Sequence, residues 1–310
     1  MSRSSASPVS PESIGELQEQ LTTHQYVADV GLATSIYLAL KLKRPLLLEG
    51  EAGVGKTEVA KVLAATLDTD LIRLQCYEGL DVTHAVYEWN YARQLIEIRV
   101  AEAKSDVARD HHDRVGELFG PDFLIERPLL QALRGGRARP PVLLIDELDR
   151  ADEEFEGYLL EVLSDFQVTI PELGTITATT PPVVVITSNR TRELHDALKR
   201  RCLYAWIDYP DFDKELQIVT TKVPGASAAL AEQVTRFVQE LRRADLYKAT
   251  GVSETLDWVA ALVALNRQEL DAATIERTLG IILKNQEDIQ NMRGDRIQDM
   301  LNLAKTPGTR

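Results

Sequence analysis

Cysteines, aromatic residues and long apolar runs are all scarce in this chain of 310 residues. The two cysteines, Cys76 and Cys202, are not spaced as a zinc site or a redox motif, so we expect both to be reduced, partly buried thiols. No apolar run approaches the length of a membrane span, and residues 1–8 lack the apolar core of a signal peptide. These absences predict a cytoplasmic protein without a membrane span.

Basic residues are also in deficit. Lys and Arg number 35 against 48 for Asp and Glu, which gives a net charge of −13. A surface this acidic disfavours broad contact with nucleic acid or anionic membranes, so no nucleic-acid partner is expected, although a local basic pore is compatible with it. The content of 44% hydrophobic and 27% charged residues is that of a globular protein, and the length predicts a larger and a smaller domain.

A glycine-rich loop follows the apolar run at residues 46–48 and precedes a helical sequence. It reads Gly50, Glu51, Ala52, Gly53, Val54, Gly55, Lys56, Thr57, Glu58. Glycines at these places let backbone N–H groups turn toward phosphates, and the helix start adds its positive dipole end. Lys56 would reach the β- and γ-phosphates, and the hydroxyl of Thr57 would bind a magnesium ion. We therefore predict a site for ATP and Mg²⁺.

Two further apolar runs end in polar residues. Residues 142–145 lead into Asp146 and Glu147, as expected for a strand buried on both faces of a parallel sheet. Asp146 would hold the magnesium ion through water, and Glu147 would orient and deprotonate the attacking water. After the run at 183–187, Asn189 would contact the γ-phosphate and that water. We predict Glu147 and Asn189 as catalytic residues.

Three consecutive cations, residues 199–201, follow a helix predicted over residues 192–198. Cations at this position are favourable at the C-terminus of a helix, which is a purely structural explanation. The functional alternative is an arginine finger that reaches the γ-phosphate bound by the next subunit. For that role we favour Arg201, with Arg200 second.

The segment at residues 77–126 is an inserted element without a clear pattern. Its aromatic residues either pack in a core or face a central pore or a partner; they are Tyr77, Tyr87, Trp89 and Tyr91. A helix is predicted over residues 94–106. The run at 110–114 contains two histidines between aspartates, which favours a solvated tip over a metal site.

The order of elements predicts an α/β nucleotide-binding domain, with a parallel sheet flanked by helices, followed by a small all-α lid domain. From residue 211 onward the periodicity is helical, and such a lid would couple hydrolysis to motion. The expected boundaries are a disordered tail at 1–11, the α/β domain at 12–209 with a hairpin at 167–178, the lid at 210–304, and a second disordered tail at 305–310.

The stretches quoted above together resemble an AAA+ ATPase. The resemblance rests on residues 50–57 and 144–147, on Ser188-Asn189 and on Arg200-Arg201, and it covers residues 14–300. Asp149-Arg150-Ala151 and the hairpin are similar to the MoxR family. Within that family, residues 75–81, 87–91 and 253–258 most resemble the ATPase associated with maturation of aerobic carbon monoxide dehydrogenase.

This resemblance implies a homo-oligomer, a hexameric ring, that acts as a chaperone-like machine on a metalloenzyme client. It also implies a partner with a von Willebrand factor A domain, and its subgroup implies the molybdenum–copper enzyme as the client. In ring ATPases the adenine is held by the region just before the phosphate loop. Tyr26 and Val27 are therefore candidate adenine contacts, with an ordinary core contact as the alternative.

One position departs from the family pattern. Where the family often has a Pro-Arg pair that supplies a second sensor arginine, this chain has Glu254-Thr255. Either another arginine substitutes, such as Arg242 or Arg243, or the lid senses nucleotide differently. Two other functions use the same phosphate loop: a P-loop phosphotransferase, and a nucleotide-dependent scaffold that hydrolyses ATP poorly.

Overall fold

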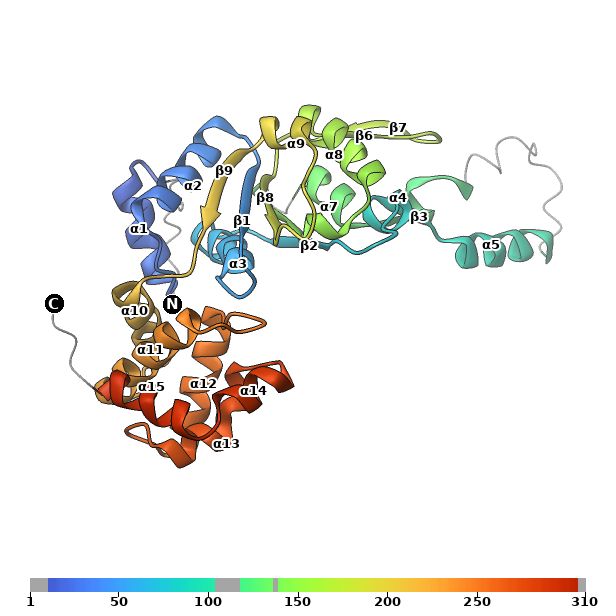
Figure 1. Cartoon of the computed structure of the whole chain (residues 1–310). Coiled ribbons are helices and arrows are strands. Elements are labelled where there is room, and N and C mark those ends of the chain that lie inside the picture. Colours follow the sequence, from blue (N-terminus) through green and yellow to red (C-terminus); the bar gives the residue numbers. More distant parts are fainter. Residues whose placement is uncertain (1–10, 104–117, 136–138, 306–310) are drawn as a thin grey trace, which may run out of the picture. The chain divides into compact units, whose positions relative to one another are not determined.

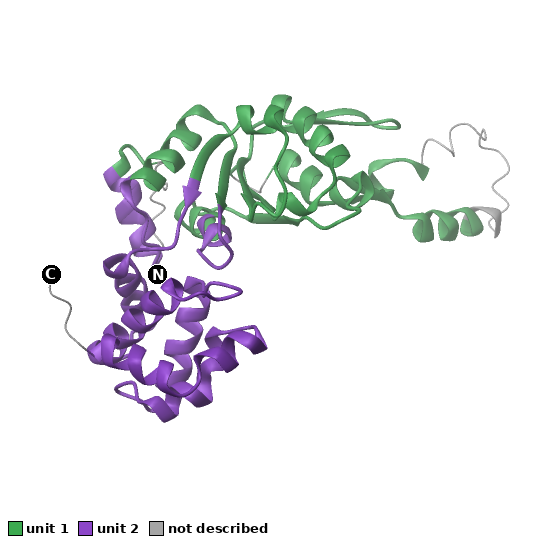
Figure 2. Ribbon diagram, in the orientation of Figure 1, with its two compact units in different colours: residues 1–14, 31–49, 60–205 green, residues 15–30, 50–59, 206–310 purple. Residues whose placement is uncertain are grey.

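The computed structural model describes residues 11–103, 118–135 and 139–305. These residues form two compact units (Figure 2), each described here by itself. Unit 1 comprises residues 1–14, 31–49 and 60–205, and unit 2 comprises residues 15–30, 50–59 and 206–310. The units follow packing rather than the order of the chain, so the expected domain boundary after residue 209 stays a prediction.

A five-stranded sheet organises unit 1 (Figure 1). Its strand order is β2–β5–β8–β1–β9, and the pairs from β2 to β1 are parallel. The strands are β1 (Leu46–Gly50), β2 (Leu71–Gln75), β5 (Val142–Asp146), β8 (Val183–Ser188) and β9 (Leu203–Ile207). Because Ile145 pairs with Ile186 and Glu49 pairs with Ser188, the carboxyl ends of the three central strands lie together. The segments after these strands therefore leave the sheet at the same edge.

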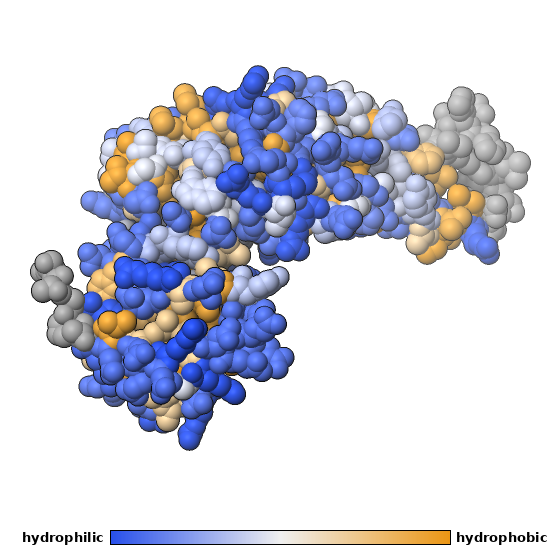
Figure 3. All heavy atoms as spheres, viewed as in Figure 1, coloured by the Kyte–Doolittle hydropathy of each residue, from blue (hydrophilic) through white to orange (hydrophobic). Residues whose placement is uncertain are grey.

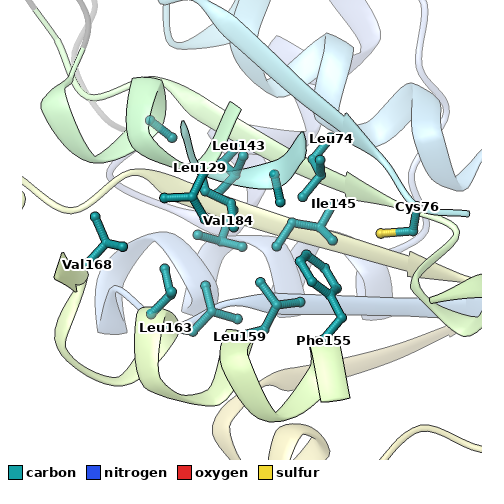
Figure 4. Packing of buried hydrophobic residues seen from close by; sticks show 14 of the residues in the cluster. Leu74, Cys76, Leu129, Leu143, Ile145, Phe155, Leu159, Leu163, Val168 and Val184 are labelled. Atoms are coloured by element: carbon teal, nitrogen blue, oxygen red, sulfur yellow. The ribbon is translucent and has the colours of Figure 1, made fainter. Parts of the chain in front are cut away.

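The central strands are buried on both faces, which explains their continuous apolar runs. On one face the strands pack against α7 (Pro128–Arg134), α8 (Glu153–Asp165) and α9 (Asp196–Arg201). Figure 4 shows Phe155, Leu159 and Leu163 of α8 pointing at residues from the sheet. Their spacing of four residues places them on one side of α8, as the amphipathic sequence predicts.

Unit 1 contains further elements among its described residues. They are α2 (Val30–Leu42), most of α3 (Lys56–Thr66), α4 (Val82–Ala85), α5 (Tyr91–Ala103), two 3₁₀ turns (Pro121–Phe123 and Leu148–Arg150), and two antiparallel pairs. The first pair joins β3 (Tyr87–Trp89) to β4 (Leu124–Glu126). The second joins β6 (Gln167–Ile170) to β7 (Gly174–Thr177), over the segment expected to be a hairpin.

The aromatic residues of the inserted element divide between core and surface. Trp89 is buried and meets Phe119 edge-on, with ring centroids 5.3 Å apart, and Tyr87 packs against the same core. Tyr77 and Tyr91 are exposed instead. Neither explanation of the aromatic patch holds for all four residues, because Tyr87 and Trp89 share one face of β3, whereas Tyr77 and Tyr91 lie outside this strand.

Helix α5 carries apolar side chains on the surface. The exposed ones are Tyr91, Leu95, Ile96, Ile98 and Val100. Figure 3 shows them as a hydrophobic region next to residues that the structure does not describe. The helix begins at Tyr91 rather than at the expected residue 94, whereas residues 104–106 of the expected helix and the charged run at 110–114 lie outside the described residues.

Unit 2 contains a helical bundle whose core is built around Phe237 and Trp258 (Figure 1). Its helices are α10 (Phe212–Lys222), α11 (Ala228–Arg243), α12 (Val252–Ala264), α13 (Ala272–Ile282), α14 (Gln286–Met292) and α15 (Asp295–Lys305). Several begin at residues whose side chains accept a hydrogen bond from the first turn, such as Ser227 from Leu230 N–H. Most of α1 (Ile14–Thr23) and the first turn of α3 also belong to this unit.

The predicted fold class is confirmed: a parallel sheet flanked by helices is followed by a helical region. The tails expected to be disordered lie, except for residues 11 and 305, outside the described residues. In the part of the chain that the structure describes, no helix combines the length and the apolar character needed to cross a membrane.

We expect Leu159→Ala to lower the free energy of unfolding by about 2–5 kcal/mol, because it leaves a cavity between α8 and the sheet. Urea unfolding followed by circular dichroism measures the change. Leu42→Ala is the control: its side chain is exposed, so a loss below about 0.5 kcal/mol is expected. Equal losses in the two variants would contradict the packing described here.

Candidate functional site

The glycine-rich loop lies in unit 2 and has the backbone that its sequence requires. Gly50, Gly53 and Gly55 all have positive φ angles, of 152°, 77° and 94°. A Cβ atom on Gly50 would lie 2.1 Å from the carbonyl oxygen of Ile207, so no other residue fits there. Helix α3 begins at Lys56, directly after the loop. The loop therefore precedes a helix N-terminus, the arrangement that binds phosphate.

Lys56 reaches back across this loop. Its buried ammonium donates hydrogen bonds to the carbonyl oxygens of Gly50, at 2.7 Å, and Glu51, at 2.6 Å. These carbonyls hold a cation at the mouth of an anion-binding loop. Thr57 lies next to it in the first turn of α3, and Glu58 pairs there with Lys222, with N–O separation 3.0 Å.

A cavity of about 220 Å³ adjoins the loop within unit 2. Its apolar wall comes from Val27, Val54, Ile207, Pro210, Ile218 and Leu256, and two lysines, Lys214 and Lys222, also line it. Tyr26 lines it as well, and burial, followed by the charges of Asp29 and Glu58, raises the pKa of its phenol, which stays protonated. The structure thus places Tyr26 and Val27 beside residues 53–55 of the loop.

In unit 1, Asp146 ends β5 as a buried carboxylate that Arg73 and Thr187 contact. Arg73 donates to its Oδ2 from NH2, at 2.6 Å, and from Nε, at 3.0 Å, while the hydroxyl of Thr187 donates to Oδ1 at 2.6 Å. Asp146 is 2% exposed, so these partners offset the cost of burying its charge. Arg73 comes from β2 and Thr187 from β8, the strands on either side of β5.

Glu147 follows in a left-handed conformation, with φ of 55°. Its N–H donates to Thr187 Oγ at 2.9 Å. One carboxylate oxygen, Oε2, accepts a hydrogen bond from the amide of Gln75 at 3.2 Å and pairs with Arg150 Nε at 3.0 Å. Backbone and side chain are both held, so the carboxylate has a defined position at the edge of the sheet.

Asn189 leaves β8 at the same edge, and Asp149 holds the turn that follows. The buried carboxylate of Asp149 accepts hydrogen bonds from Asn189 N–H at 3.1 Å, from Thr191 N–H at 2.9 Å and from Thr191 Oγ at 2.7 Å. Burial alone would raise the pKa of Asp149. The donors outweigh burial, and the pKa lies below its usual range.

The helix that carries the arginine pair lies further along the chain than predicted. The helix predicted over residues 192–198 is wrong in its bounds: α9 spans Asp196–Arg201, because His195 caps its start by accepting a hydrogen bond from Ala197 N–H. Arg200 and Arg201 consequently form its last turn. Arg201 donates from Nε to Ser164 Oγ at 2.8 Å, and both arginines are exposed.

Arg44 fixes the end of this helix. Its guanidinium donates to the carbonyl oxygens of Arg200, at 2.7 Å, and Arg201, at 3.1 Å. These are the carbonyl groups that lack a partner inside the helix. The favourable cation at this helix end is thus supplied by Arg44, together with the helix's own basic residues.

Arg242 and Arg243, the two alternatives for a second sensor arginine, have different surroundings. Arg242 is buried in unit 2 and forms a two-pronged ion pair with Glu215, both N–O distances being 2.6 Å. Its Nε donates to the carbonyl oxygen of Thr250 at 2.7 Å. Arg243 is on the surface and pairs with Glu240. Arg242 is a structural residue of the bundle in this arrangement.

The sequence reasoning missed several residues that hold the predicted ones: Arg73, Gln75, Asp149, Thr187 and Arg44. For Arg73 and Gln75 a signal existed, because polar residues alternate along the predicted strand at 71–74 and just beyond it. For Arg44 none did.

Both cysteines are free thiols, as predicted, and they are fully rather than partly buried. Burial raises the pKa of Cys76 to about 12, and the charges of Asp146 and Asp149 act in the same direction. Among the residues that the structure describes, no group of three or more His, Cys, Asp or Glu side chains could hold a metal ion by itself. A magnesium ion here would need ligands from a bound nucleotide as well.

The family of this chain follows from its sequence match. Residues 45–202, just over half of the chain, match the AAA domain of the dynein-related subfamily. The chain belongs to this AAA family. Its members are P-loop ATPases, so ATP binding and hydrolysis are the general properties of the family, as is frequent assembly into oligomers.

Two relatives found by sequence comparison share a quarter of the aligned residues with this chain. An uncharacterized protein of Staphylococcus haemolyticus is 25% identical over 251 residues, covering 78% of this chain and 85% of its own length. An uncharacterized protein of Staphylococcus aureus is 25% identical over 231 residues, covering 72% and 77%. Neither description names an activity.

Solved structures show a limited likeness. The RuvB Holliday junction branch migration motor of Thermotoga maritima has 16% identity and a TM-score of 0.46, over 91% of this chain and 75% of that one. A Cytophaga hutchinsonii protein described only as a candidate ATPase has 17% identity and a TM-score of 0.45, over 95% and 94%. At these values the likeness supports no argument about function.

We expect Asp149→Asn to lower the free energy of unfolding at pH 7 by about 1–3 kcal/mol, because an amide N–H₂ then faces backbone and hydroxyl donors. The pKa of Asp149 is lowered by folding, so its stabilisation is present above the ordinary Asp pKa and is lost as pH falls through the folded value. Urea unfolding at pH 7 and at about pH 3 tests this, since the gap between variant and wild type should narrow in acid. Asp165→Asn, an exposed site on α8, is the control. A gap that does not depend on pH would contradict the assignment.

Proposed function

We propose that this chain is a magnesium-dependent ATPase that works in a ring and remodels a protein client. The observation that carries the nucleotide site is the loop at residues 50–57 with Lys56 folded across it, next to an apolar cavity that Tyr26 lines. A flat apolar base fits such a cavity, and the phosphates would take the place of the loop carbonyls as partners of Lys56. Membership of the AAA family supports this proposal.

In the proposed reaction, the N–H groups of the loop and Lys56 bind and orient the phosphates. Thr57 and Asp146 would hold a magnesium ion, which neutralises developing charge on the phosphates when bound. Glu147 accepts a proton from the attacking water while the bond from the water oxygen to the γ-phosphorus forms and the bond to the bridging oxygen breaks. Asn189 positions that water.

The structure supports these roles for Asp146, Glu147 and Asn189 by bringing the ends of β5 and β8 to one edge of the sheet. It also adds a condition. Gln75 and Arg150 both contact Oε2 of Glu147, so the base acts on water through its other oxygen or after these contacts rearrange.

We further propose that Arg201, or Arg200 after it, completes the site of a neighbouring subunit as an arginine finger. Both lie exposed in the last turn of a helix whose end Arg44 fixes, which favours a defined direction for the side chains. A finger in trans requires assembly, and a hexamer is the ring size that the sequence resemblance implies.

The client belongs to this proposal as well. The resemblance of residues 75–81, 87–91 and 253–258 to one MoxR subgroup supports a cytoplasmic chaperone role in metalloenzyme maturation, with the molybdenum–copper carbon monoxide dehydrogenase as the client. A protein with a von Willebrand factor A domain would be the adaptor. The exposed apolar side chains of α5 offer a surface for such partners.

We expect Glu147→Gln to bind ATP with wild-type affinity and to lose at least about a hundredfold in turnover, because the base is removed while the phosphate contacts remain. Equilibrium binding and phosphate release measure the two effects. Glu153→Gln, an exposed residue of α8, is the matched control and should leave turnover unchanged. Lys56→Ala should abolish tight binding instead. Full turnover in Glu147→Gln would show that the base is another residue.

We expect ATP turnover per subunit to rise with protein concentration and to fall by about a thousandfold or more in Arg201→Ala, because the finger acts across a subunit boundary. Arg277→Ala, at an exposed position on α13, is the control and should leave turnover unchanged. A rate that is independent of concentration and of Arg201 would indicate a self-contained site, as in a P-loop phosphotransferase. ATP binding without turnover in the wild type would indicate the scaffold.

A further inference from the structure

Helix α12 of the bundle touches the phosphate loop, and both lie within unit 2. Ser253, in its first turn, donates a hydrogen bond from N–H to the carbonyl oxygen of Gly53 at 3.2 Å. A Cβ atom on Gly251, the N-cap of this helix, would lie 2.9 Å from Gly53 Cα and 3.0 Å from the Ala52 carbonyl oxygen. Two backbones therefore meet directly, which requires glycine on both sides of the contact.

Glu254 extends this contact with a carboxylate. A Cβ atom on Gly53 would lie 3.0 Å from its Oε2, and one on Gly251 would lie 2.6 Å from the same atom. This oxygen is buried, and it accepts no hydrogen bond from any residue that the structure describes. A buried carboxylate oxygen without a donor is unfavourable, so this arrangement needs a compensating attraction.

Among the residues that the structure describes, none forms an ion pair with Glu254, and the nearby Lys214 and Lys222 pair with Asp29 and Glu58. Burial raises the pKa of Tyr209, and the charges of Glu51, Asp208 and Glu254 act in the same direction, whereas Arg242 acts against them. Arg242 is already committed to Glu215. The remaining attraction comes from the loop itself, whose N–H groups and following helix N-terminus favour an anion.

We propose that Glu254 is a specificity-determining residue that competes with nucleotide phosphates for the electropositive loop. In the nucleotide-free chain its carboxylate lies against Gly53 and keeps the first turn of α12 on the loop. Bound phosphates bring negative charge to the same place, so Glu254 is repelled and the Ser253–Gly53 hydrogen bond breaks. The proposal rests on the proposed nucleotide site.

The charge of Glu254 is opposite to that of a sensor arginine, so bound phosphates would act on the two side chains in opposite ways. An arginine at the start of a lid helix would be drawn toward the phosphates, whereas Glu254 is driven away from them. The repulsion grows with phosphate charge, so it weakens binding of a triphosphate more than binding of a diphosphate. The lid would then separate from the loop when ATP binds and return with ADP or the empty site.

A purely structural role must be distinguished from this one. Glu254 is the third residue of α12, where a carboxylate stabilises the helix start. Glutamine is favourable at the third position of a helix as well, because its side chain can accept a hydrogen bond from the N-cap N–H. Glu254→Gln therefore removes the charge at constant size and keeps the helix start.

The test compares binding of a non-hydrolysable ATP analogue and of ADP by calorimetry, in the presence of magnesium. We expect Glu254→Gln to bind the analogue roughly tenfold more tightly than the wild type, with a smaller gain for ADP and a narrower gap at high salt. Glu254→Asp, which keeps the charge, should behave as the wild type does. Glu276→Gln, with the same charge change at an exposed position on α13, should change neither affinity.

Hydrogen exchange gives a second readout, on the peptide that contains Ser253. Saturation with the analogue should remove protection of this peptide in the wild type and less so in Glu254→Gln. Unchanged affinities in Glu254→Gln, or equal gains for both nucleotides, would overturn the proposal alone. Absence of nucleotide binding in the wild type and in both Glu254 variants would overturn the nucleotide site, and this proposal with it.

Discussion

Two buried carboxylates, Asp149 and Glu156, hold the segment on which the predicted chemistry depends. Asp149 binds the turn after β8, and Glu156 accepts a hydrogen bond from His195 N–H at 2.7 Å and pairs with Arg192. Charges buried at this depth are tolerated only where donors surround them. Because both carboxylates come from the 3₁₀ turn and helix after β5, they tie Asn189 and the start of α9 to the strand that carries Asp146 and Glu147.

The acids at the end of β5 show a related principle. Asp146 and Glu147 are neighbours in sequence but have different partners, since Arg73 contacts the first and Gln75 the second. The left-handed backbone at Glu147 turns the chain sharply after the strand, which separates the two carboxylates. The two carboxylates therefore have different surroundings, which is compatible with the separate roles proposed for them.

Much of the sheet was predictable, because a strand buried on both faces leaves a continuous apolar run such as residues 142–145. The phosphate loop was predictable from its glycines, whose positive φ angles few other residues adopt. The residues that hold these side chains could not be predicted. Arg44 and Arg200 are 156 positions apart in the sequence, and Arg242 and Glu215 are 27 positions apart. No local pattern indicates a pairing at such separations. The error at α9 had a local cause, since a histidine served as N-cap where serine, threonine, aspartate or asparagine is usual. The contact of Gly251 with Gly53 could not be predicted either, because no local pattern reports which distant backbone a glycine approaches.

The bond network of Arg44 has a mechanical consequence. Arg44 immediately precedes Pro45, whose carbonyl oxygen accepts a hydrogen bond from Leu203 N–H at 2.8 Å. The side chain of Arg44 donates hydrogen bonds to the carbonyl oxygens at the end of α9. A displacement of α9 would therefore strain these hydrogen bonds at the start of β1. Arg44 thus connects the last turn of α9 with the start of the strand that leads into the glycine-rich loop, and it does so independently of Lys56, Asp146, Glu147 and Asn189.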